Sequence, residues 1–149
     1  MLSNNKIWRS LLFVPANSWK MLNKSLSQMQ DGVIIDLEDA CPILEKDAGR
    51  KFARDIMPML KAKGIDVIVR VNSLSTGMTI DDLKIVITED IDGIMLPNSE
   101  TKDDIIQLAG LIDEIENARK IKKRTDILPL IESPQGVINA YDIGIASDR

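Results

Sequence analysis

In Gly32-Val33-Ile34-Ile35-Asp36-Leu37-Glu38-Asp39-Ala40, a short apolar run ends abruptly in three acidic residues, Asp36, Glu38 and Asp39. An apolar run of this length is typical of a strand that is buried on both faces, as strands of parallel sheets are. Such a strand has no solvated side that could hold a carboxylate, so acids at its end lie at the rim of the sheet, beside water, a metal or a partner. The stretch therefore predicts a parallel sheet with chemistry at its rim.

Similar apolar runs occur four more times, and helical patterns separate them. The predicted strands are, in chain order, residues 11–14, 33–37, 66–72, 92–98 and 127–131. Alternating strands and helices with connections this short require right-handed crossovers and a mostly parallel sheet. Two architectures satisfy that pattern. One is an open doubly wound α/β sheet, for which five strands are complete, and the other is a (β/α)₈ TIM barrel, for which these are about the first five βα units.

Three helix starts carry recognisable signals. Thr79 with Asp82 has the spacing of a capping box for a short helix, although Asp stands where Glu or Gln is commoner. Thr101 with Asp104 opens a long helix, and Ser133 is an N-cap residue followed by a helix-starting proline. We therefore expect helices to begin near residues 79, 101 and 134.

The composition narrows the chemistry. The chain has 149 residues, a formal net charge of -4, no histidine and one cysteine. Without histidine, a mechanism must use carboxylates, Arg, Lys, Ser, the single Tyr or a metal with oxygen ligands, which excludes His-based triads and argues against a zinc site. The single Cys41 cannot form an internal disulfide, and we expect it to be a small packing residue.

The charge pattern and hydropathy also bear on location and partners. The basic residues are scattered except for a cluster at residues 120–124, which we interpret as a solvated helix terminus, so we expect no nucleic-acid partner. No apolar run approaches the ~20 residues that a membrane helix needs. Residues 1–6 lack the apolar core of a signal peptide. We therefore expect a cytoplasmic protein without a membrane segment.

Polar groups follow four of the five predicted strands. They are Asp36, Glu38 and Asp39, then Arg70 and Asn72, then Asn98, and finally Glu132. In a barrel these strand ends converge on one mouth, whereas an open sheet spreads them along an edge. Carboxylates without a nearby His suit Mg²⁺ or Mn²⁺, and an Arg fork beside them suits a substrate carboxylate. Because such a joint use needs convergence, the strand ends favour the barrel. No strand is followed by a Gly-rich phosphate loop, which argues against a nucleotide-binding sheet.

Each acid also has a structural interpretation. Asp39 could cap the helix that follows it, and Glu38 could pair with Arg70 or Lys46 at the rim. Asp36 alternates with apolar neighbours, so an inward-pointing Asp36 could serve only as the partner of Arg70. Arg70 itself ends an apolar strand and needs an anionic partner. These alternatives stay open on the residues alone.

Five motifs in this order and spacing resemble those of the citrate lyase β-subunit-like family, which belongs to the HpcH/HpaI aldolase group. They lie at residues 9–15, 35–40, 69–72, 95–97 and 130–133. The resemblance covers essentially the whole chain. It is specific for the family but does not identify the substrate.

The resemblance implies a TIM-barrel lyase that uses Mg²⁺ to cleave a 3-hydroxyacyl-CoA, citryl-CoA-like, into an acyl-CoA such as acetyl-CoA and an α-keto acid such as oxaloacetate. It implies that Arg70 and Glu132 are the catalytic and substrate-binding residues, with Arg70 on the keto-acid carboxylate and Glu132 as a ligand of the metal. Four residues would support them: Asp36, Glu38, Asp39 and Asn72. The implied enzyme is a homo-oligomer or a subunit of a lyase complex.

The sequence departs from the family pattern in three places. The second metal carboxylate of the family would lie beyond Arg149, Asn98 stands where lysine is usual, and Ala16 stands where glycine is usual. We therefore expect residues 1–149 to be the N-terminal portion of a single TIM-barrel lyase domain. Two alternatives remain. One is a class II aldolase that acts on free hydroxy-keto acids, and the other is a non-catalytic truncated subunit that needs a partner.

Overall fold

Five parallel strands form one sheet in which the spatial order of the strands is their order along the chain. The computed structural model describes residues 7–149, so residues 1–6, on which the signal-peptide expectation depends, lie outside the described residues. The strands are β1 (Leu11–Pro15), β2 (Gly32–Asp36), β3 (Asp66–Arg70), β4 (Gly93–Leu96) and β5 (Asp126–Pro129). All five predicted strands are thereby confirmed, and the last four end earlier than expected.

The strand order distinguishes the two architectures that the sequence left open. A doubly wound sheet reverses its strand order at a switch point, whereas a barrel wall adds each strand beside the previous one. Here β1 pairs with β2, β2 with β3, β3 with β4 and β4 with β5, each pair parallel. The described residues therefore have the order of a barrel wall, with β1 and β5 at its two edges.

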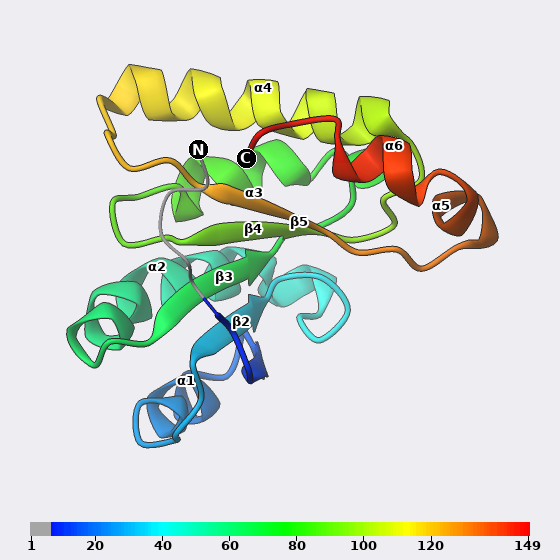
Figure 1. The fold of residues 1–149 in the computed structure, drawn as a ribbon. Helices are drawn as coiled ribbons and strands as arrows, with labels where there is room; N and C mark the ends of the chain where they lie inside the picture. The colour runs from blue at the N-terminus through cyan, green and yellow to red at the C-terminus, as the bar shows by residue number, and fades with distance from the viewer. Residues whose placement is uncertain (1–6) are drawn as a thin grey trace.

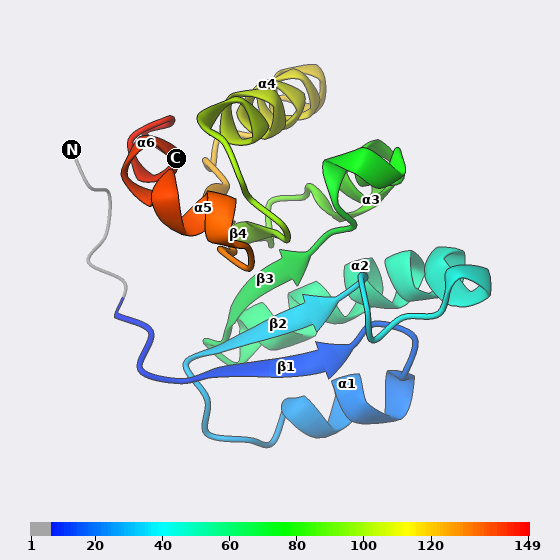
Figure 2. The ribbon, with the colours of Figure 1, turned by 90° about the vertical axis from the view of Figure 1, so that its right-hand side faces the viewer.

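The helices of the βα units cover one face of the sheet (Figures 1 and 2). They are α1 (Trp19–Ser25), α2 (Lys46–Ala62), α3 (Thr79–Val86) and α4 (Lys102–Arg119), with the one-turn 3₁₀ helices η1 (Ile43–Glu45) and η2 (Leu74–Thr76) before α2 and α3. Two short helices, α5 (Pro134–Ile138) and α6 (Ala140–Gly144), follow β5. Ser133 caps α5 by accepting a hydrogen bond from Gly136 N–H, as expected.

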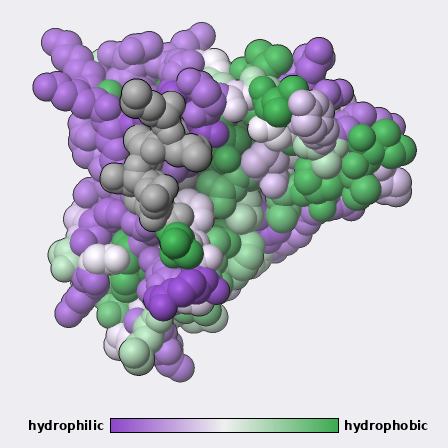
Figure 3. Space-filling view, viewed as in Figure 1, coloured by the Kyte–Doolittle hydropathy of each residue, from purple (hydrophilic) through white to green (hydrophobic). Residues whose placement is uncertain are grey.

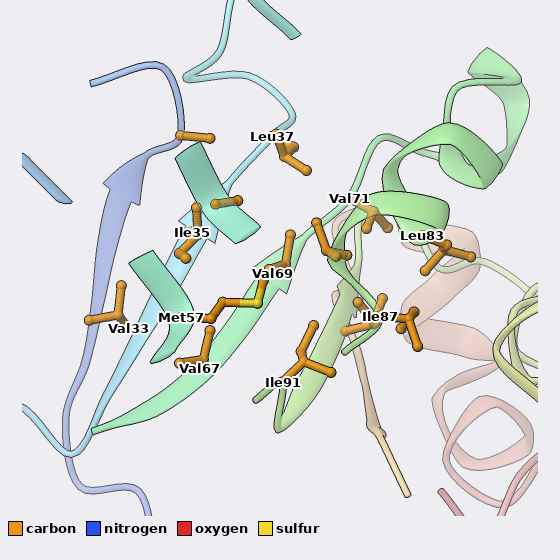
Figure 4. Close-up of a cluster of buried hydrophobic side chains, with 14 of the residues drawn as sticks. Val33, Ile35, Leu37, Met57, Val67, Val69, Val71, Leu83, Ile87 and Ile91 are labelled. Carbon is orange, nitrogen blue, oxygen red and sulfur yellow. The ribbon is translucent and has the colours of Figure 1, made fainter. Parts of the chain in front are cut away.

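The central strands β2, β3 and β4 are buried on both faces, but the two faces bury different clusters. Because successive side chains of a strand point to opposite faces, Val33 and Ile35 of β2 pack with the helices in the main core (Figure 4). Ile34 points the other way and meets Ile68 and Met95 in a second, smaller cluster. This double burial is what the apolar run in β2 predicted. Cys41 is 2% exposed and belongs to the main core, which confirms its packing role.

The long helix α4 begins with the capping box that the sequence predicted. Thr101 Oγ1 accepts a hydrogen bond from Asp104 N–H, and the Asp104 carboxylate accepts one from Thr101 N–H at 2.8 Å. Both bonds satisfy N–H groups that have no partner within the helix. We therefore expect Thr101→Ala to lower the free energy of unfolding by about 1 kcal/mol, measured by urea denaturation. An unchanged unfolding midpoint would contradict this role.

The second predicted capping box, at α3, is wrong. Met78 is the N-cap residue, and no side chain caps this helix. Thr79 Oγ1 instead donates to the carbonyl oxygen of Asn72 at 2.9 Å, and Asp82 is fully buried and binds Asn72 and Arg50. The two residues thus join α3 to the end of β3, because buried polar partners from other elements outweigh a local cap.

At the amino ends of the strands, a buried carboxylate holds the bottom of the sheet together. Asp92 is 2% exposed and pairs with Lys61 at 2.7 Å and with Lys123 at 2.8 Å. Lys123 belongs to the basic cluster that the sequence suggested was solvated, and Arg124 of that cluster pairs with Asp148. Arg124 is still exposed, as the expectation of a solvated terminus requires, whereas Lys123 is partly buried against Asp92 and departs from it.

Some apolar side chains are exposed. Figure 3 shows apolar surface over α5, at its right-hand end. There Val137 is 66% and Ile138 is 78% exposed, and Tyr141 in α6 is 76% exposed. Within residues 7–149, no helix combines the length and the apolar character that crossing a bilayer requires.

Candidate functional site

The carboxyl ends of β2 and β3 meet at an arginine held by three acids. Asp36 and Arg70 are register partners, so they lie side by side. Asp36 binds Arg70 through both carboxylate oxygens, at 2.9 Å to Nε and 2.5 Å to Nη2. Arg70 Nη1 lies 2.9 Å from the Glu38 carboxylate and 3.9 Å from that of Asp39. One edge of the guanidinium is therefore fixed by Asp36, and the Nη1 end points toward the other two acids.

Burial separates the roles of the three acids. The side chain of Asp36 is 3% exposed, that of Glu38 is 16% exposed and that of Asp39 is 83% exposed. The structural interpretation of Asp36 as the partner of Arg70 is thus confirmed, and so is the pairing of Glu38 with Arg70. The capping interpretation of Asp39 is wrong, because α2 begins only at Lys46.

An aromatic ring, which the sequence reasoning missed, also holds Arg70. The guanidinium carbon of Arg70 lies 5.4 Å from the centre of the Phe13 ring in β1, a cation–π distance. The only signal in the sequence was an aromatic residue in the first of several parallel strands. Phe13 is 48% exposed, so the ring forms an apolar wall beside the charged group.

The pKa values of Asp36 and Glu38 are shifted in opposite directions. Burial raises the pKa of Asp36, but hydrogen bonds from Arg70 and from two backbone N–H groups outweigh burial, so the pKa is lowered. The pKa of Glu38 is raised, mainly by burial; the charge of Arg70 opposes this, and the nearby carboxylates of Asp39 and Glu132 reinforce it. Glu132, which follows β5, is thus electrostatically linked to the acids that follow β2.

The lowered pKa of Asp36 makes stability depend on pH. Ionised Asp36 stabilises the fold above its unfolded pKa of about 4, and this contribution is lost as the pH falls through the lower folded pKa. The contribution of Glu38 to stability depends on pH in the opposite direction. Its pKa is raised in the folded state, so this contribution is lost as the pH rises through the folded pKa. We expect the urea midpoint of the wild type to fall more steeply below about pH 4 than that of Asp36→Asn. Parallel pH profiles would contradict this linkage.

Glu132 lies where the strand pattern placed it, at the carboxyl edge after β5. Its Oε2 accepts a hydrogen bond from the backbone N–H of Asn98 at 3.1 Å, and Asn98 has a left-handed backbone with φ of 51°. A cleft of about 240 Å³ adjoins Asn98 between the loops after β3 and β4. It is lined by Ser73, Leu74, Ser75, Leu96, Pro97, Asn98, Glu100 and Asp104.

The oxygen donors at this edge have the right chemistry for Mg²⁺ but do not complete a site. Glu132 is an exposed carboxylate with one oxygen bound to a backbone N–H, which leaves the other oxygen available. No three His, Cys, Asp or Glu residues among those described are arranged to hold a metal. Glu132 therefore fits as one ligand, and residues 7–149 do not gather three such groups around it.

Asn72, predicted as a supporting residue, lies beneath the rim. It is 2% exposed, and its side-chain amide donates to Asp82 at 2.7 Å while its Oδ1 accepts from Lys46 Nζ at 2.7 Å. Asp82 was missed as part of the site, and Lys46, expected as a possible ion-pair partner of Glu38, binds the backbone carbonyl of Glu38 instead of its carboxylate. A signal existed for Lys46, since it shares a helical stripe with the buried residues of α2, namely Gly49, Arg50, Ala53, Ile56, Met57 and Leu60.

Comparisons with known proteins agree with this arrangement. Residues 9–149 match the family model described as HpcH/HpaI aldolase/citrate lyase. The chain is 35% identical over 145 residues to the citrate lyase subunit beta of Haemophilus influenzae, covering 97% of this chain and 50% of that protein. It is 26% identical to the human mitochondrial citramalyl-CoA lyase, covering 88% of this chain and 39% of that protein. The chain thus spans about half the length of the curated relatives it matches.

The fold has solved counterparts. The citrate lyase beta subunit of Mycobacterium tuberculosis, solved with oxaloacetate and magnesium, aligns with a TM-score of 0.72 and 28% identity. The alignment covers 92% of this chain and 53% of that one. The resemblance inferred from the five sequence motifs is thereby confirmed. The strand order, the residues at the strand ends and these matches agree, and the chain belongs to the HpcH/HpaI aldolase/citrate lyase family.

Proposed function

We propose that the protein carrying this chain is a Mg²⁺-dependent carbon–carbon lyase that cleaves a 3-hydroxyacyl-CoA into an acyl-CoA and an α-keto acid. Citryl-CoA, acetyl-CoA and oxaloacetate are the proposed examples. Residues 1–149 would form the first five βα units of a TIM-barrel domain. The observation that carries the proposal is the orientation of Arg70, whose Nη1 end faces the acids at the sheet edge while Asp36 holds its other edge.

Arg70 would bind the carboxylate of the keto-acid half. A guanidinium has two edges that can donate paired hydrogen bonds, and Asp36 occupies the edge formed by Nε and Nη2. The end formed by the two Nη atoms is the one left for a substrate, and there Glu38 is the competing anion. Phe13 would pack against the substrate side of the site.

Glu132 would be one protein ligand of the Mg²⁺, with a further carboxylate from outside residues 7–149. When bound, Mg²⁺ would supply positive charge where negative charge develops on the hydroxyl oxygen of the substrate. In the cleavage, the substrate hydroxyl loses its proton and becomes the carbonyl of the keto acid as the carbon–carbon bond breaks. The electron pair of the broken bond stays with the acyl-CoA, which forms an enolate. The enolate then takes up a proton and becomes the acyl-CoA product. Arg70 would keep the keto-acid half aligned for this step.

Isothermal titration of oxaloacetate, with and without Mg²⁺, tests the proposal. We expect oxaloacetate binding that depends on Mg²⁺. In a separate cleavage assay, we expect the protein to cleave the CoA thioester and to leave the free hydroxy acid intact. Equal cleavage of the free acid would favour the class II aldolase instead. Absence of both Mg²⁺ and oxaloacetate binding in a soluble, folded sample would favour a non-catalytic subunit.

A further inference from the structure

A buried lysine lies directly beneath the acids of the site. Lys46 is the first residue of α2 and is 7% exposed. Its Nζ donates to the backbone carbonyl of Leu37 at 2.5 Å, to that of Glu38 at 2.7 Å and to Asn72 Oδ1 at 2.7 Å. An ammonium group has three hydrogens to donate. All three are therefore used, and two of them hold the backbone of the turn that carries the acids.

The partners of this cation are unusual because all of them are neutral. Buried charges in proteins are normally paired with an opposite charge. Arg50, the other buried cation among residues 7–149, pairs with Asp82 at 2.8 Å, whereas Lys46 has no carboxylate within ion-pair distance. The buried ammonium of Lys46 therefore holds neutral groups in place, and two of its three partners are backbone carbonyls. It also adds positive charge below a cluster that contains three acids and one Arg.

The turn between β2 and α2 is held from two sides. Asp36 accepts hydrogen bonds from the backbone N–H groups of Glu38 at 2.8 Å and of Ala40 at 3.2 Å. Lys46 binds the carbonyl groups of the same turn. With both kinds of backbone group engaged, the direction of the Glu38 side chain is set, and its carboxylate meets Nη1 of Arg70. Lys46 therefore acts on Arg70 through Glu38.

The third hydrogen bond of Lys46 ties this turn to the next βα unit. The Asn72 amide can only be oriented one way, because the Asp82 carboxylate only accepts hydrogen bonds and the Lys46 ammonium only donates them. Asp82 accepts a second bond from Asn72 N–H at 2.7 Å and a third from Arg50 Nε at 2.8 Å. This chain of bonds links α2, the ends of β2 and β3, and α3.

We propose that Lys46 is a positioning residue for the keto-acid site, which fixes the Glu38 turn and thereby the free end of Arg70. This inference rests on the proposed function for its effect on substrate. Its effect on the turn can be measured without substrate. The chain also offers a matched control in Lys61, which is partly buried and bonded to Asp66 and Asp92 at the opposite end of the sheet.

The test compares Lys46→Met with Lys61→Met in the protein that carries this chain. We expect Lys46→Met to weaken oxaloacetate binding by about 10- to 100-fold, the range typical of residues that orient a binding group from behind. Lys61→Met should lower the melting temperature and leave the oxaloacetate affinity within about twofold, because the lost charge lies at the end of the sheet where stability resides. Equal affinities in the two variants would overturn the proposal.

Hydrogen exchange supplies the readout that does not need substrate. In Lys46→Met, amide exchange at residues 38–40 should become faster while exchange in β3 and β4 stays as in the wild type. Uniform acceleration over the whole sheet, or no acceleration at residues 38–40, would overturn the positioning role. If the wild type binds no oxaloacetate, the proposed function fails, yet local acceleration in Lys46→Met would still support the role of Lys46 in holding the turn.

Two further variants guard against loss of folding. Lys46→Arg keeps the charge and can donate to both carbonyls, so we expect it to recover part of the affinity that Lys46→Met loses. Asn72→Ser removes one acceptor and keeps a polar group, and it should give a smaller change in the same direction. An Arg variant no better than the Met variant would show that the hydrogen bonds to the turn are not what matters.

Discussion

Glu132→Gln should reduce Mg²⁺-dependent cleavage by more than about 100-fold, beyond the loss usual for residues that only support a metal ligand. The amide keeps the shape of the side chain and its hydrogen bond from Asn98 N–H, which needs only an acceptor oxygen. What it loses is the negative charge, which a hard cation such as Mg²⁺ requires. The measurement is initial rate against Mg²⁺ concentration, with CoA thioester at saturation.

Glu100→Gln is the matched control for this variant. Glu100 is also an exposed carboxylate and lies in the loop after β4, where it lines the cleft beside Asn98. Its loss changes the net charge near the cleft by the same amount but removes no proposed ligand. We expect its Mg²⁺ dependence to match the wild type. Glu132→Gln activity that recovers fully at ordinary Mg²⁺ concentrations would refute the ligand role.

Arg70→Met should destabilise the fold by about 3–5 kcal/mol, because it leaves the carboxylate of Asp36 buried without its cation. The Asp36 side chain is 3% exposed, so water does not replace the lost partner. Urea denaturation measures the effect. The double variant Asp36→Leu with Arg70→Met should be more stable than Arg70→Met alone, since the uncompensated charge is then gone. A double variant that is less stable would contradict this explanation.

Arg70→Lys separates binding from stability. A lysine ammonium is a point charge that cannot hold both oxygens of Asp36 and also present a flat, paired donor edge to a substrate. We therefore expect the KM for the keto acid in the condensation direction to rise by at least about 10-fold, with a smaller loss of stability than in Arg70→Met. Unchanged saturation by oxaloacetate would remove Arg70 from the site.

The strands and most helix starts could be predicted because their signals are local. The run before Asp36 is apolar on both faces, and a strand of that kind has few alternatives. The capping box at Thr101 was predictable for the same reason. At Thr79 the identical spacing misled, because Asp82 lies opposite Asn72 and Arg50, which are distant in sequence. Local patterns cannot show such partners.

The site was predictable to the extent that strand ends converge. Arg70 and its neighbouring acids come from adjacent strands, so strand order alone brings them together. Phe13 escaped prediction, and Lys46 was expected only as an ion-pair partner of Glu38, because each acts through a contact with another element, namely a ring beside a guanidinium and an ammonium beneath a turn. The role of Glu132 as a metal ligand stays a prediction, carried by its position and by the family pattern.

The strand order of the sheet also bears on how the chain is made. Each of the strands β2 to β5 pairs with the strand synthesised just before it, so each finds its first partner already made. Contacts between sequential units keep loop-closure costs low and favour folding from the N-terminus during translation. The arrangement that gathers Arg70 and the acids is thus also one that can grow strand by strand, and the N-terminal half of the site can form before Glu132 leaves the ribosome.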